Sequence, residues 1–92
     1  MSRRNELVEE LRSHLRTLTG VLVDPDEDFF ARGLVDSLRS LEIVVHVERE
    51  YGLSVEVDDL ELDNFRTVDR IADFVLRKQA EHAPADVEEA ST

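Results

Sequence analysis

The chain has 92 residues, and its 22 acidic side chains outnumber the 11 basic ones, which gives a formal net charge of −11 at pH 7. This length predicts a single domain, near the lower limit for a fold held without disulfides or metal ions. The chain contains no cysteine, so disulfides and thiolate metal sites are excluded. The acidic surplus argues against nucleic acid and anionic membranes as partners, because both are bound by clustered lysine and arginine.

No segment of the sequence has the character of a membrane span or a secretion signal. The longest apolar run, residues 43–45, is far too short to cross a bilayer. The first residues include two arginines but no apolar stretch behind them. We therefore expect a soluble, cytoplasmic protein that does not bind membranes.

The first helix and the connection after it are marked by apolar spacing and by glycine. Leucine and valine recur at helical intervals over residues 5–19, and Gly20 suits the left-handed position that ends a helix. Residues 21–35 contain a proline and several acids, which predicts a long loop. Phe29 and Phe30 are expected to anchor this loop, because two adjacent exposed phenylalanines are unfavourable.

A second helix follows the turn at Gly33. Asp36 is its expected N-cap, and Gly52 is the expected glycine at its end. Residues 53–57 alternate in polarity but have no strand with which to pair, so they are interpreted as an extended loop.

Two further helices complete the expected fold. A short third helix is predicted over residues 59–64, capped by Asp58, with Leu60 and Phe65 directed into the core. Thr67 is the expected cap of the fourth helix. Three long helices, one short helix and a long first loop predict an all-α fold, a small antiparallel bundle.

The end of the chain differs in composition from the rest. Residues 81–92 are acidic and alanine-rich, contain Pro84, and have one large apolar side chain, Val87. This composition predicts a disordered tail that follows a domain of residues 1–80.

The second helix has two apolar faces when residues are placed at about 100° per step. The stripe around Ile43 and Val47 can face the core, whereas a second stripe, headed by Ser37, falls on the opposite side. A bundle of this size cannot bury both faces, so we expect the second stripe to be exposed and to bind a partner. The alternatives are cover by the third helix or dimerisation. This docking strip consists of Leu38, Leu41 and Val45, with Glu42 and Glu48 on its borders.

The segment that leads into the second helix resembles the acyl carrier protein family. An acidic stretch, Phe29-Phe30 and Gly33 precede the motif Asp36-Ser37-Leu38 at the family's spacing, and the resemblance covers residues 5–79. In that family the serine of this motif carries a covalent 4′-phosphopantetheine arm. The resemblance implies that Ser37 is the attachment residue, that Asp36 belongs to the same site, and that the chain is a carrier without catalytic activity of its own.

The resemblance also implies partners and a role. A phosphopantetheinyl transferase would attach the arm from coenzyme A, and a loading enzyme would place an acyl or aminoacyl group on its thiol as a thioester. Synthases or acyltransferases would then use that group, and the carrier itself is expected to be a monomer. The style of the motif resembles discrete carriers of bacterial natural-product pathways, which favours polyketide or related secondary metabolism. An aminoacyl or D-alanyl carrier and an unmodified helical interaction module remain the alternatives.

One departure from the family concerns charge. Arg39 and Arg49 stand on the second helix where many fatty-acid carriers have acids. They lower its negative charge, so enzymes that select a uniformly acidic helix are expected to bind weakly.

Two other kinds of site fit the sequence less well. A hydrolase would need a base beside Ser37, but His46 falls about 180° away around the helix and the Gly-x-Ser-x-Gly motif is absent. The alternating acids of residues 24–28 lack the glycine and distant glutamate of a calcium loop, and Pro25 interrupts them. We therefore predict neither a catalytic residue nor a metal site.

Overall fold

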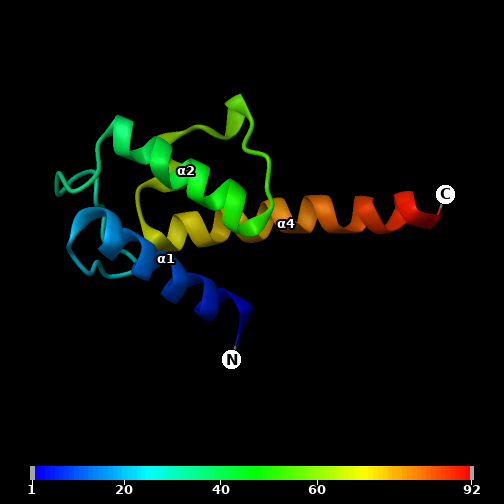
Figure 1. The fold of residues 1–92 in the computed structure, drawn as a ribbon, viewed down its shortest axis with the longest axis horizontal. Coiled ribbons are helices and arrows are strands. Elements are labelled where there is room, and N and C mark those ends of the chain that lie inside the picture. The colour runs from blue at the N-terminus through cyan, green and yellow to red at the C-terminus, as the bar shows by residue number, and fades with distance from the viewer. Residues whose placement is uncertain (1, 92) are drawn as a thin grey trace.

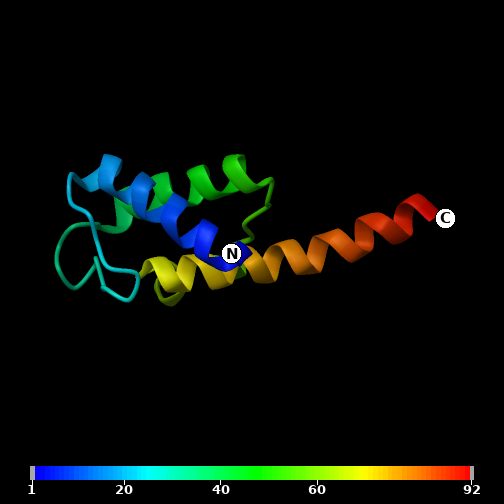
Figure 2. The ribbon, with the colours of Figure 1, turned by 90° about the horizontal axis from the view of Figure 1, so that it is seen from below.

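The computed structural model describes residues 2–91, with the side chains of residues 2–61 and 63–81. Over these residues the chain is helical and contains no strand, which confirms the all-α prediction with three long helices and one short one. In Figure 1, α4 crosses the molecule beside α1 and α2 and then extends beyond them; Figure 2 shows α1 and α2 on the same side of α4. The elements are α1 (Arg3–Thr19), α2 (Ser37–Tyr51), the 3₁₀ turn η1 (Val57–Asp59), α3 (Leu62–Phe65) and α4 (Val68–Ser91).

The core lies between the three long helices and is closed by the long loop after α1. Phe29 is fully buried, as the sequence predicted for an anchor of that loop, and Phe30 packs beside it. Phe65 and Phe74 meet with ring centroids 5.1 Å apart, which joins α3 to α4. The apolar stripes predicted for the helices are confirmed; their fully buried members include Leu7, Leu11, Leu15, Ile43, Val47, Val68, Ile71 and Val75.

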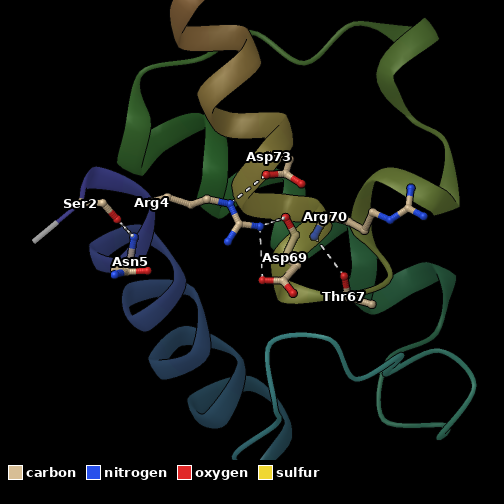
Figure 3. A network of polar contacts seen from close by, with 7 residues as sticks. All are labelled: Ser2, Arg4, Asn5, Thr67, Asp69, Arg70 and Asp73. Carbon is tan, nitrogen blue, oxygen red and sulfur yellow. Dashed lines mark hydrogen bonds and ion pairs between the residues drawn. The ribbon is translucent and has the colours of Figure 1, made fainter.

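Two side-chain caps define the starts of α1 and α4. The Asn5 N–H donates to Ser2 Oγ at 3.1 Å, so the first helix begins two residues earlier than predicted. The Arg70 N–H donates to Thr67 Oγ1 at 3.0 Å, which confirms the predicted cap of α4 (Figure 3).

An ion-pair network joins the first turn of α1 to α4. Figure 3 shows the Arg4 guanidinium between two acids of α4. Its Nε lies 3.0 Å from Asp73 Oδ1, and its Nη2 lies 3.3 Å from Asp69 Oδ1. These partly exposed pairs link the start of α1 to α4, and each contributes little to stability.

The long loop is tied to the corner between α3 and α4. The Arg66 Nε donates to the Asp28 carboxylate at 2.9 Å, while the Phe29 N–H donates to the Arg66 carbonyl at 3.1 Å. The Asp69 N–H donates to the Pro25 carbonyl at 2.9 Å. These bonds hold residues 25–29 of the loop to the corner, and through the buried Phe29 they help to position the start of α2.

The predicted third helix over residues 59–64 is wrong in its bounds, because the chain there forms η1 and α3 as separate short elements. Asp59 ends the first of them: its carboxylate accepts the Glu56 N–H at 3.0 Å and the Lys78 ammonium at 2.9 Å. Leu60 was expected in the core, but 48% of it is exposed. Asp58, the predicted cap, lies inside η1 and caps neither element. The Asp59–Lys78 bond is a long-range contact, which the local pattern does not contain.

The helix α4 continues to Ser91, so the backbone of residues 81–91 is helical where the composition suggested disorder. Alanine and glutamate, which dominate this segment, have high intrinsic helix propensity. Thr92 lies outside the described residues, and the domain boundary after residue 80 stays a prediction. Within the described part of the chain, no helix combines the length and apolar character that a membrane crossing requires.

Candidate functional site

Ser37 is the first residue of α2, and its side chain is exposed. The preceding residue, Asp36, has an extended backbone, and its carboxylate accepts the Arg39 N–H at 2.9 Å. This N-cap confirms the expected start of the helix. Gly33 has a φ of +75°, a conformation that side chains with a Cβ rarely adopt, and it turns the loop into the helix.

The start of α2 is held from two directions. The Leu34 and Val35 N–H groups donate to the carbonyl of the buried Phe29 at 2.9 and 3.2 Å. From the other side, the Arg39 guanidinium donates to the Leu18 carbonyl, in the last turn of α1, at 2.7 Å. The Ser37 hydroxyl is therefore presented to solvent from a fixed backbone.

A small groove opens beside Ser37 between α2 and α3, with a volume of about 220 Å³. Leu60 belongs to this surface, although its place in the sequence pattern predicted a core position. No local pattern would have revealed it, since Leu60 lies between η1 and α3, which are too short to repeat a helical spacing. The groove is lined by Ser37, Ser40, Leu41, Val44, Leu60, Glu61 and Phe65.

The docking strip is exposed, as the helical geometry predicted. The exposed fractions are 73% for Leu38, 52% for Leu41 and 48% for Val45, whereas Ile43 and Val47 on the opposite face are fully buried. The short third helix therefore leaves the strip open to solvent. Exposure of three large apolar side chains along one helix is typical of an interaction surface.

The two glutamates predicted at the borders of the strip occupy different environments. Glu42 is exposed and lines a wider groove between α1 and α2. Glu48 is half-buried, and its carboxylate accepts the Val55 N–H at 2.9 Å, so it also fixes the loop that follows α2. Arg49 lines the same groove as Glu42.

The structure brings two histidines together, but away from Ser37. His46 stacks on His14 of α1 with a centroid distance of 3.6 Å. Neither ring lines the groove beside Ser37. Among the described residues, no group of three or more His, Asp or Glu side chains has the arrangement of a metal site.

A family model described as the phosphopantetheine attachment site matches residues 9–75 of the chain. The chain belongs to the family of phosphopantetheine-dependent carrier proteins. It is also 33% identical over 58 residues to D-alanyl carrier proteins of Streptococcus pyogenes serotype M5 (strain Manfredo) and serotype M1. These matches cover 63% of this chain and 71% of each relative. The cofactor of this carrier is covalent 4′-phosphopantetheine.

The residues at the start of α2 fit this cofactor. Ser37 offers an exposed hydroxyl, and the first-turn N–H groups of a helix, together with its dipole, favour a phosphate there. The apolar side chains in the α2–α3 groove border the same position. The site can thus accept both a charged phosphodiester and the less polar chain attached to it.

Proposed function

We propose that Ser37 carries the phosphopantetheine arm and that the protein is a discrete carrier, which presents acyl groups to biosynthetic enzymes and performs no catalysis itself. The observation that carries this proposal is the exposed Ser37 hydroxyl at the fixed start of α2, within the residues that match the family model. When attached, the arm supplies a terminal thiol that holds an acyl group as a thioester.

Asp36 contributes to this site by holding the first turn of α2. Its carboxylate satisfies the Arg39 N–H, so the helix starts at Ser37 and not later. A phosphate on Ser37 then lies at the positive end of the helix dipole, an interaction of about 0.3–1 kcal/mol.

The docking strip and its glutamates would bind the enzymes that act on the arm. An apolar strip beside acids is complementary to a surface with apolar pockets and a basic rim. We infer that a phosphopantetheinyl transferase, an acyl- or aminoacyl-loading enzyme and a synthase or acyltransferase each bind this face. Glu42 is the more direct contact for such partners, because Glu48 is already engaged by the loop.

Two kinds of cargo are candidates. The motif around Ser37 favours an acyl group of polyketide or related secondary metabolism. The relatives, which are named D-alanyl carrier proteins, favour an aminoacyl group, and this is the second candidate.

The attachment residue is tested by intact mass after incubation with coenzyme A, Mg²⁺ and a phosphopantetheinyl transferase. The wild type should gain one arm, and Ser37→Ala should gain none. Ser40→Ala is the matched control, because Ser40 lies one turn later in the same groove and should leave modification intact. Gain of an arm by Ser37→Ala would refute the site; failure of the wild type to gain one would refute the carrier function and favour an unmodified interaction module.

The cargo is tested on the modified protein. One sample receives D-alanine, ATP and a D-alanine-activating ligase, and a second receives malonyl-coenzyme A and an acyltransferase. A mass increase in the first sample alone selects the aminoacyl carrier, and an increase in the second alone selects the acyl carrier.

A further inference from the structure

Two histidines from different helices form an unusually close contact. The rings of His14, in α1, and His46, in α2, are nearly parallel, with 3.6 Å between centroids and 6° between planes. Tyr51 packs edge-on against His46 at 6.4 Å, and its hydroxyl donates to Glu10 of α1 at 2.8 Å. These three aromatic side chains connect one face of α1 to α2.

The stack is one of several contacts that join α1 to α2, whose buried leucine, isoleucine and valine side chains share the core. The backbones of α1 and α4, and those of α3 and α4, come together more extensively than those of α1 and α2. Besides the histidine stack and the Tyr51–Glu10 bond, the Arg39 bond to the Leu18 carbonyl crosses between the two helices. The two half-buried histidines therefore add an aromatic contact to the apolar core that the two helices share.

The surroundings of His14 favour its neutral form. Its Nε2 is buried and has no hydrogen-bond partner among the described residues. Burial, and next the neighbouring His46 ring, lower the pKa of His14, and the acids Glu42 and Glu50 oppose this shift only in part. The charged and titratable groups around the pair are Glu9 and Glu10 from α1 and Glu42, Arg49, Glu50 and Tyr51 from α2.

We propose that the His14–His46 stack is a pH-sensitive contact that holds α1 against α2 while the rings are neutral and loosens when both are protonated. Two positive rings in van der Waals contact repel each other, and the neighbouring acids Glu42 and Glu50 offset this effect only in part. Because the pKa of His14 is lower in the fold than its ordinary value of 6.5, the unfolded chain binds this proton first. The contribution of the stack to stability is thus complete above pH 6.5 and is lost as the pH falls below it.

The stack should also affect the binding of partners, a consequence that rests on the proposed function. The stack lines the α1–α2 groove of about 770 Å³, together with Leu41 and Val45 of the docking strip. With neutral histidines the charged groups of this groove, Glu42, Arg49 and Glu50, are net negative, whereas two added protons make the groove net positive. A basic partner attracted at neutral pH would then be repelled in acid.

Histidine ring NMR on the full-length protein tests the contact directly. The His14 midpoint is expected below 6.5, and replacing its neighbour in His46→Phe should move that midpoint upward, because a neutral aromatic ring removes the repulsion. The control, His82→Gln, removes a histidine outside the pair and should leave the His14 midpoint unchanged. A His14 midpoint at 6.5 or above in the wild type would overturn the proposal, and this measurement needs no variant to fold. A His14 midpoint that does not change in His46→Phe would overturn it as well.

Thermal unfolding at pH 7.5 and 5.5 tests the effect on stability. The titration of the many carboxylates also changes stability over this range, so the quantity to compare is the difference between variant and wild type at each pH. His46→Phe should gain about 2–6 °C relative to wild type on passing from pH 7.5 to pH 5.5. His82→Gln should show no such gain, and an equal change in both variants would exclude a role for the stack.

Docking is tested by the rate at which the transferase modifies Ser37. The quantity to compare is the rate for the wild type divided by the rate for His46→Phe, at pH 7.5 and at pH 5.5. The ratio should fall in acid. A constant ratio beside a confirmed titration would overturn the docking consequence alone, whereas absence of modification in both proteins would count against the proposed function.

Discussion

At the scale of single residues, Asp36 acts on the helix through one hydrogen bond. Asp36→Ala removes the acceptor of the Arg39 N–H and should cost about 1 kcal/mol, which lowers the melting temperature by about 4–8 °C in a domain of this size. Asp36→Asn is the control, since asparagine caps a helix about as well as aspartate. Equal losses in the two variants would show that the charge of Asp36, and not its role as a cap, stabilises the fold.

Asp28 stabilises the loop that delivers Ser37. Its carboxylate accepts the Ala31 N–H and the Arg66 guanidinium, and these contacts, the Ala31 bond foremost, lower the pKa of Asp28. A lowered pKa means that the ionised side chain stabilises the fold above pH 3.8 and that this contribution disappears as the pH falls through the lower folded value.

Asp28→Asn should therefore lower the melting temperature at pH 7 more than Asp26→Asn, a change at an exposed position of the same loop. The difference should shrink as the pH falls below 3.8. Thermal unfolding from pH 7 to pH 3 measures both effects. A difference that persists unchanged at pH 3 would mean that the carboxylate charge is not what holds the loop.

At the scale of elements, the two faces of α2 should respond oppositely to the same substitution. Val47 is fully buried and Leu41 is 52% exposed. Val47→Ser should cost more than 2 kcal/mol, since it leaves a cavity and buries a hydroxyl, while Leu41→Ser should change stability by about 0.5 kcal/mol or less.

The same pair separates packing from docking. Leu41→Ser should slow modification of Ser37 by the transferase while the protein stays folded, as checked by circular dichroism and thermal unfolding. If Leu41→Ser destabilises the fold as much as Val47→Ser, the docking strip is part of the core and the docking proposal fails.

The sequence predicted long elements well and short ones poorly. The buried and exposed faces of α2 could be predicted from helical periodicity, because the same angular step between residues holds over all fifteen positions of the helix. In contrast, η1 and α3 are too short for such repetition, and the Asp59 side chain at the end of η1 binds Lys78, 19 residues away. The His14–His46 stack joins residues of two helices, and neither residue differs locally from an ordinary exposed histidine. Contacts between residues far apart in the sequence cannot be predicted from the local spacing of residue types.

Across the whole fold, the groups that hold Ser37 in place are separate from those that we propose to bind partners. The buried residues and the loop anchored by Asp28 and Arg66 fix the start of α2. The outward face of α2 takes no part in that core, so its apolar side chains and acids are free to serve recognition. The large negative charge extends the attraction of a basic partner beyond contact distance, with a range set by the ionic strength.

The C-terminal half of α4 can be removed to test whether the groups that hold Ser37 in place lie within residues 1–80. Among the described side chains of α4, which reach residue 81, the last buried one is Lys78, whose ammonium binds Asp59 at 2.9 Å. Figure 1 shows the helix continuing past the other elements. A chain that ends at Ala80 keeps these contacts, and among the described side chains, which reach residue 81, it loses the weak approach of Glu81 to Lys78 at 3.9 Å. Its melting temperature should therefore stay within about 2 °C of the full chain, because one exposed ion pair contributes little. Helical ellipticity should fall as the terminal turns are removed, and Ser37 should be modified at the same rate. A large drop in melting temperature would show that the carrier domain extends beyond residue 80.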